Sequence, residues 1–190
     1  MIVHFEELQL KDRYKIMSRS IVPRPIAWIV TEGEGINIAP FSYFTGLSSE
    51  PPTLIVSIGH KKDGSPKDTL INILATKKCT ICSVTPQQLK QMHQSAETLE
   101  YGQSEAEKFG ILTKRIEKEY PPIVADSPTA LFCSLYQRVD LKGSKTIPLI
   151  LKIEKAYLDD SLTGEGYDID FTPVGRVGKE YCICDKKIEP

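Results

Sequence analysis

The sequence predicts a mainly β fold, an antiparallel barrel with a few helices on its outside. Short apolar, β-branched runs recur along the 190 residues, each bounded by Gly, Pro, Asp or Ser, which is typical of strands separated by turns. These runs do not alternate regularly with helical patterns, which argues against a doubly wound parallel sheet. No internal repeat or change in composition divides the chain, so we expect one domain over residues 1–190.

The predicted strands are the runs richest in β-branched and apolar residues. They are Ile26–Thr31, Thr53–Ile58, Thr80–Thr85, Ala130–Leu141 and Ile147–Leu158. The turn between the first of these and the next extended segment is expected at Gly33–Gly35.

Helical patterns are fewer than strand patterns. Asp68–Lys77 begins with a candidate N-cap and places its large apolar side chains on one face. Pro86–Ser95 follows Thr85, which gives a capping threonine and a proline at the first helical position. A third, short helix is expected from Ser104, because Glu107 stands three residues later as in a capping box.

Composition narrows the class of protein. A formal net charge of −1, without an arginine-rich run or basic stripe, argues against nucleic-acid binding. No apolar stretch approaches the length of a membrane span, and the N-terminal residues do not resemble a signal peptide. The odd number of cysteines, five, indicates reduced thiols, so we expect a cytoplasmic protein without membrane or nucleic-acid partners.

Cysteines and histidines do not predict a metal centre. Cys79 and Cys82 have the CxxC spacing, but on a strand residues i and i+3 point to opposite faces. Cys182 and Cys184 share a strand face, although two thiolates alone are a weak metal signal. The three histidines are scattered along the chain: His4, His60 and His93.

The segment Ser18–Trp28 places Arg24 between two prolines. Because proline restricts the backbone on both sides, the planar guanidinium could be aimed at a phosphate. The alternative is a surface loop with a solvated arginine.

A second unusual segment is Asn37–Phe44. Pro40 cannot donate to a β-ladder, so we expect this segment at a sheet edge or bulge. There the backbone N–H and C=O groups could bond the edge of a heteroaromatic ring. The alternative is an aromatic-rich strand end that faces the core.

The third segment, Lys67–Asn72, begins the predicted helix at Asp68. A helix N-terminus presents unpaired N–H groups and a partial positive charge, and both favour phosphate. Lys67 and Thr69 would add a cation and a hydroxyl. The alternative is an Asp-capped helix beside a solvated lysine.

Taken together, four segments resemble one known family. SRSIVPRPIAWIV, NIAPFSYFTGLSSEPPTLIVSIG, KDTLINI and the closing DFTPVGRVGKEYC resemble the flavin reductase-like FMN-binding split-barrel family, which includes the flavoredoxins. The likeness runs from about Tyr14 to Cys184, with the segments in the same order and at similar spacings.

This resemblance implies a six-stranded antiparallel split β-barrel of Greek-key type, assembled as a homodimer with FMN near the subunit interface. It implies phosphate contacts from Arg24, Lys67 and Thr69, while Asn37 through Ser42 would follow the isoalloxazine. The complete set of implied FMN contacts is Arg24, Asn37, Ala39, Pro40, Phe41, Ser42, Ser57, Lys67, Asp68, Thr69 and Asn72. No catalytic side chain is expected, because hydride transfer to the flavin needs no side-chain acid or base.

One segment departs from the family pattern. Many members have a histidine and then Ile-Gly-Glu-Val after the long strand, on the nicotinamide side of the site, whereas Lys145–Leu151 reads KTIPLIL. Three functions therefore stay open. They are an NADH- or NADPH-dependent flavin reductase, a flavoredoxin-like FMN carrier reduced by a protein partner, and a non-redox protein that binds flavin or another phosphate ligand. A monooxygenase is a further possible partner.

Overall fold

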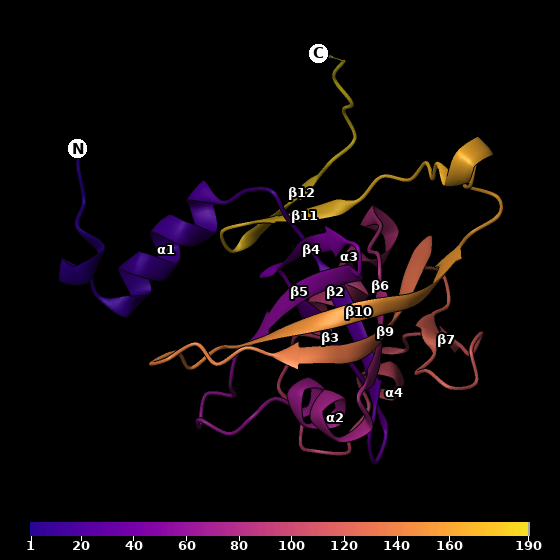
Figure 1. The fold of residues 1–190 in the computed structure, drawn as a ribbon, viewed down its shortest axis with the longest axis horizontal. Coiled ribbons are helices and arrows are strands. Elements are labelled where there is room, and N and C mark those ends of the chain that lie inside the picture. Colours follow the sequence, from indigo (N-terminus) through magenta and orange to yellow (C-terminus); the bar gives the residue numbers. More distant parts are fainter. Residues whose placement is uncertain (190) are drawn as a thin grey trace.

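The computed structural model describes residues 1–189 and is built on one seven-stranded sheet (Figure 1). Every neighbouring pair of strands in this sheet is antiparallel, and the order across it is β3-β2-β6-β9-β10-β5-β4. The strands are β2 (Ala27–Glu32), β3 (Ile36–Phe41), β4 (Phe44–Ser49), β5 (Pro52–Ile58), β6 (Lys78–Cys82), β9 (Thr129–Arg138) and β10 (Ile147–Leu158).

The prediction of a mainly β fold is confirmed, but the predicted number of strands, six, was wrong. The sheet has seven strands because both β3 and β4 pair along their full lengths, and within residues 1–189 no ladder joins these two edges into a closed barrel. Ser42 and Tyr43 alone connect β3 to β4, so the two edges must approach each other although they stand at opposite ends of the strand order. The short connection therefore curls the sheet.

The individual strands follow the predicted runs closely. The run Ile147–Leu158 coincides with β10. The run predicted at Thr80–Thr85 starts two residues earlier and ends at Cys82, because Thr85 leaves the ladder to cap the next helix. Pro40 lies on β3, an edge strand, as expected from its missing N–H.

The sheet separates two apolar cores. Side chains alternate across β2, so that Ala27 and Ile29 pack in one core and Trp28 and Val30 in the other, all four of them buried. Trp28 is therefore a core residue, and its Nε1–H donates to Ser95 Oγ at 2.9 Å.

The predicted helices occur, with different ends. Asp68–Thr76 forms α2, whose N-cap residue is Lys67 rather than Asp68. Pro86–Gln88 forms the 3-10 turn η2, which carries the predicted capping interaction with Thr85, and it continues into α3 (Leu89–Gln94).

The third predicted helix is α4, Glu105–Phe109, but its predicted capping box is wrong. Ser104 Oγ is buried and has no hydrogen-bond partner among residues 1–189. The carboxylate of the neighbouring Glu105 accepts a hydrogen bond from Ile38 N–H of β3 and does not cap the helix.

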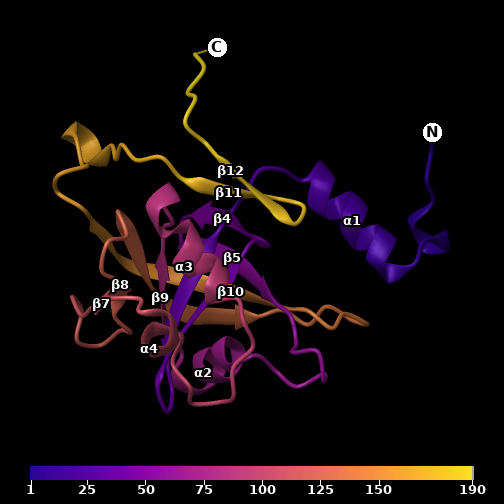
Figure 2. The same ribbon diagram turned by 180° about the vertical axis from the view of Figure 1, so that it is seen from behind.

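Two features were not predicted: an N-terminal helix and a small second sheet. Helix α1, Leu10–Ser20, projects from the body of the molecule in both ribbon views (Figures 1 and 2). The second sheet has the order β1-β11-β12 and includes the C-terminal hairpin. Its strands are β1 (Arg24–Pro25), β11 (Val174–Val177) and β12 (Glu180–Ile183).

The remaining short elements lie in the connections. They are η1 (Phe5–Glu7), β7 (Thr113–Lys114), β8 (Ile123–Val124) and η3 (Glu165–Tyr167). None of the helices within residues 1–189 combines the length and the apolar character that crossing a bilayer requires.

Candidate functional site

An open cavity, with about 460 Å³ of empty space including solvent at its mouth, lies between the edge strand β3 and the N-terminus of α2. Its lining comes from four parts of the chain that the sequence separates widely. The residues are Asn37, Ala39, Pro40, Phe41, Lys61, Lys67, Asp68, Thr69, Ser95, Ala96, Glu97, Thr98, Leu99 and Glu105. Two of the three predicted segments therefore meet in one cavity.

The α2 end of this cavity carries two lysines with different surroundings. Lys61 Nζ lies 2.6 Å from Asp68 Oδ1 in an ion pair that is largely buried. Lys67 belongs to none of the ion pairs found among residues 1–189. Burial, and secondarily the charge of Lys61, lower the pKa of Lys67. Lys67 is thus a partly desolvated cation at a helix N-terminus, in no direct ion pair but close enough to the carboxylates of Asp68 and Glu105 for their charges to oppose part of this lowering of its pKa.

Side-chain amides hold the hydroxyl of Thr69 in place. Asn37 Nδ2 donates to Thr69 Oγ1 at 2.9 Å and to Thr31 Oγ1 at 3.1 Å. Asn72 Nδ2 also donates to Thr31 Oγ1, at 3.1 Å. Because Thr69 Oγ1 accepts from Asn37, its own proton remains available for a ligand in the cavity.

Asn72 does not line the cavity; it supports the wall from behind. Its Oδ1 accepts from Tyr101 OH at 3.3 Å, and a Cβ at Gly33 would lie 2.4 Å from that oxygen. Glycine in the β2–β3 turn therefore allows the turn to lie against α2.

The other wall is the free edge of β3. Ile38 N–H donates to Glu105 Oε2 at 2.9 Å, which shows that the backbone groups of residue 38 point away from β2. Since a strand repeats every two residues, the backbone groups of Pro40 point the same way, and Ser42 follows directly after the strand. Pro40 lacks an N–H, so its position on this edge offers a carbonyl only. Burial raises the pKa of Glu105.

A second, open cavity, with about 470 Å³ of empty space including solvent at its mouth, adjoins the first and shares Pro40, Phe41 and Ala96 with it. Ser42, the predicted contact farthest along this edge, lines it. Its remaining lining comes from α1, α3 and the second sheet, and includes Tyr14, Ile26, Met92, Arg176 and Tyr181. Along β3 the two cavities thus run from an end that holds two lysines and three carboxylates to an aromatic end.

Arg176 and Tyr181 form the far wall of this second cavity. The guanidinium carbon of Arg176 lies 4.4 Å from the centre of the Tyr181 ring, and Tyr181 OH bonds His93 Nδ1 at 2.9 Å. Sequence reasoning missed both residues as site residues. The closing segment of the family resemblance was the only signal that pointed to them.

Arg24 and Ser57 line a third, open cavity, with about 840 Å³ of empty space including solvent at its mouth, which Tyr43 also lines and which shares Ser42 with the second cavity. Arg24 is 4% exposed, and its Nη1 donates to the carbonyl oxygens of Ser18 and Ile21, at the C-terminus of α1. Its guanidinium carbon lies 5.6 Å from the centre of the Tyr43 ring. The structure therefore does not bring Arg24 to the cavity that Lys67 lines. A cation there stabilises the negative end of the α1 dipole.

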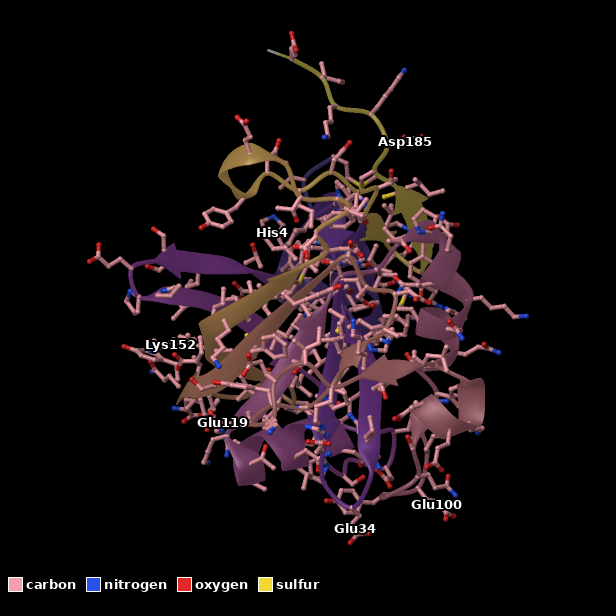
Figure 3. The ribbon with its side chains drawn as sticks, turned by 90° about the vertical axis from the view of Figure 1, so that its right-hand side faces the viewer. His4, Glu34, Glu100, Glu119, Lys152 and Asp185 are labelled. Atoms are coloured by element: carbon pink, nitrogen blue, oxygen red, sulfur yellow. The ribbon has the colours of Figure 1, made fainter. Side chains whose placement is uncertain are left out.

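The two cysteines of the CxxC motif do not form a site. Cys79 and Cys82 lie in opposite cores, as their strand spacing predicts. Within residues 1–189 no group of three or more His, Cys, Asp or Glu side chains could hold a metal ion. Figure 3 shows exposed carboxylates at the periphery, with Glu34 and Glu100 at the end of the molecule where α2 lies.

Glu105→Gln tests the electrostatics of the β3 edge. The amide oxygen of Gln can still accept from Ile38 N–H, but it cannot ionise. Because the folded pKa of Glu105 is raised, the wild type loses stability as pH rises from the unfolded value, about 4.3, through the raised one. We expect the unfolding free energy of the variant, relative to wild type, to grow between pH 4 and pH 7 in urea titrations. A constant difference across this range would contradict the assignment.

Arg24→Ala separates the two interpretations of that arginine. Loss of its charged hydrogen bonds should destabilise the attachment of α1 by about 1.5–3 kcal/mol, seen as faster amide exchange in residues 10–20. The Kd for FMN should stay within about twofold, well below one tenfold step of roughly 1.4 kcal/mol. A tenfold weaker Kd with unchanged exchange would return Arg24 to the flavin site.

Comparison with known proteins agrees with the fold. The model of the flavin reductase like domain matches residues 17–175. Nitrilotriacetate monooxygenase component B from Bacillus cereus superposes with a TM-score of 0.92 at 25% identity, over 100% of this chain and 98% of that one. The Pseudomonas fluorescens 2-nitrobenzoate 2-nitroreductase NbaA gives 0.89 at 25% identity, over 100% and 95%.

Two further proteins share the likeness, one in its fold and one in its sequence. The flavoredoxin of Desulfovibrio vulgaris (Miyazaki F) shares the fold, with a TM-score of 0.77 at 17% identity over 100% and 97% of the two chains. An uncharacterised protein of Aquifex aeolicus (strain VF5) is 32% identical over 175 residues, which are 90% of this chain and 88% of that one. With its split-barrel sheet and a family match over most of its length, the chain belongs to the flavin reductase-like family of FMN-binding split-barrel proteins.

Proposed function

We propose that this protein binds FMN in the joined cavities along β3 and passes electrons through it as an NAD(P)H-dependent flavin reductase. The observation that carries the proposal is the meeting, in one cavity, of a half-buried lysine at a helix N-terminus with the edge of strand β3. FMN combines a phosphate with a flat ring edged by amide-like groups, and these two features match the two ends of the cavity.

The phosphate belongs at the α2 end. Lys67 supplies the positive charge, Thr69 a hydroxyl donor, and the first turn of α2 free N–H groups. Asp68 contributes indirectly, since it holds Lys61 at the same end of the cavity. Asn37 and Asn72 orient the hydroxyls rather than approach the phosphate themselves.

The ring belongs along the edge formed by Ala39, Pro40, Phe41 and Ser42. The carbonyl of Pro40 faces the cavity side of β3 and would bond the polar edge of the ring together with the N–H of Ser42, which directly follows the strand. When bound, FMN supplies the redox chemistry, accepting a hydride or single electrons. The chain holds the cofactor and sets the polarity around it, which requires no side-chain acid or base. Arg24 and Ser57 lie outside this proposed site.

A second candidate function is a flavoredoxin-like carrier that a protein partner reduces. It is favoured by the segment where many relatives have a histidine and a glycine–glutamate pair. Here Ile147–Leu151 pairs with β5, and Leu149 and Leu151 are buried in the core. The segment therefore offers apolar packing where the family pattern has polar groups.

Assembly and location belong to the same proposal. Helix α1 exposes apolar side chains at intervals of three and four residues, Leu10, Tyr14, Met17 and Ile21, and a second copy of the chain would cover them in a homodimer. A redox partner protein or a monooxygenase would then bind to the dimer. Five free thiols are consistent with a cytoplasmic protein.

Lys67 variants test the phosphate end. Lys67→Met should weaken FMN binding by about 1.5–3 kcal/mol, roughly tenfold to a hundredfold, because a charged phosphate contact is lost. Since the pKa of Lys67 is lowered, wild-type affinity should begin to fall below the pH, about 10.4, at which an ordinary lysine titrates. Lys67→Arg keeps its charge up to that pH and should not show that fall.

Quenching of FMN fluorescence measures these affinities. The difference between wild type and Lys67→Arg isolates the lysine from titration of the flavin itself. Unchanged affinity in Lys67→Met, with the variant folded, would exclude Lys67 from the site.

Anaerobic spectra identify the electron donor. The purified protein should take up FMN and show flavin absorbance, and NADH or NADPH should bleach it. Bleaching by a reduced ferredoxin system alone would select the carrier function. A colourless protein that takes up no FMN but binds another phosphate ester would overturn both and leave a non-redox binding protein.

A further inference from the structure

Cys182 and Cys184 place two thiols side by side on the C-terminal hairpin, away from the proposed flavin chemistry. Their Sγ atoms are 3.9 Å apart. Cys182 is half-buried and Cys184 is exposed, whereas the other three cysteines of the chain are buried in the cores. Cys182 and Cys184 are therefore the accessible thiols of the protein.

The pair owes its closeness to the opposite strand. Cys182 stands directly across from Gly175 of β11, and Cys184 lies two residues on, so both side chains leave the same face. A Cβ at Gly175 would lie 3.0 Å from Cys182 Sγ and 3.3 Å from Cys184 Sγ. The missing side chain at Gly175 thus leaves the space that the two sulfur atoms share.

Two chemistries suit such a pair: soft-metal binding and disulfide formation. A closed structural metal site needs further ligands, and no cluster of three candidate ligands exists within residues 1–189. Two residues of a strand span about 6.6 Å between Cα atoms, which is inside the range of roughly 4.4–6.8 Å that disulfides accept, near its upper end. A bond there would form under strain and would be easily reduced.

We propose that Cys182 and Cys184 form a reversible disulfide, a redox modification site on the β11–β12 hairpin. With a peroxide as oxidant, one thiolate attacks the O–O bond of hydrogen peroxide, giving a sulfenic acid and, after protonation, one water. The second thiol then attacks that sulfur, forming the S–S bond and releasing a second water. Two thiols are oxidised by two electrons and one peroxide is reduced to two waters.

The surroundings of Cys184 set the rate of this reaction. Burial, then the contact with Cys182 and the charge of Asp185, raise its pKa. The thiolate is the nucleophile, so oxidation should be slow near neutral pH and accelerate as pH rises. The disulfide is thus a response to sustained oxidant rather than a catalytic step.

The position of the disulfide places it next to the second cavity. The same hairpin carries Arg176 and Tyr181, which line the second cavity, and residue 181 points to the face opposite to Cys182. Oxidation would therefore act on the strand directly behind that cavity wall. The inference itself does not depend on flavin binding.

Peroxide treatment of the folded full-length protein tests it, with diamide in parallel. Trypsin should release Glu180–Lys186, which contains both cysteines and no others. We expect this peptide to lose two hydrogen atoms under oxidant and to regain them with excess glutathione. Failure to form the link in the folded protein, or links only between chains, would overturn the proposal.

Glycine variants supply the matched controls. Gly175→Ala keeps both thiols but adds a Cβ that would lie 3.0 Å from Cys182 Sγ, 3.3 Å from Cys184 Sγ and 2.9 Å from Pro23 Cβ. The sulfur atoms would have to move, so the variant should slow the oxidation several-fold or abolish it. Gly46→Ala adds a methyl group on β4 where no atom lies within 4 Å, and should oxidise like wild type. Equal oxidation of the two variants would show that the structure of the hairpin does not determine the reaction.

Discussion

Strands β3 and β4 stand at opposite ends of one seven-stranded sheet, and only Ser42 and Tyr43 join them. This short link forces the sheet to curl until its edges approach each other. An edge strand exposes a row of backbone N–H and C=O groups, which is normally a liability for aggregation. Here the β3 edge is covered by α2, α4 and the residues after α3, and the covering leaves a cavity. The candidate site is thus a consequence of how the sheet closes.

The packing of α2 decides what this cavity can hold. Leu70 and Ile73 are buried in the core with the strands, which fixes the position of the helix N-terminus beside Asn37. Lys67 is then held partly out of water, which lowers its pKa, and a bound anion would stabilise its charged form. The amides of Asn37 and Asn72 satisfy the hydroxyls around Thr31, so the wall keeps one geometry before any ligand arrives.

A second layer of structure surrounds this centre. The sheet β1-β11-β12 carries the far wall of the second cavity, and Arg24 on β1 joins it to α1 through two carbonyl contacts. The hairpin also holds the Cys182–Cys184 pair on its opposite face. The flavin reductase-like core is therefore bordered by one element that exposes apolar side chains and another that carries accessible thiols.

Several features followed from the sequence alone. Strand-length apolar runs, the edge position of Pro40, the opposite faces of Cys79 and Cys82, and the start of α2 all rest on local chemistry, and the structure has them. The prediction that the segments at Asn37 and Lys67 lie together rested on their joint resemblance to a family. These signals are readable because strand alternation, proline geometry and helix termini act over a few residues.

Tertiary structure alone decided the rest. The Pro-Arg-Pro segment restricts the backbone at Arg24, but pairing with β11 and the position of α1 determine which way its guanidinium points. Lys61, Glu105 and Tyr181 enter the cavities from distant parts of the chain, and no local pattern marks them. Their placement depends on contacts between residues that the sequence keeps far apart, so it became visible only once the sheet had curled and its edges were covered.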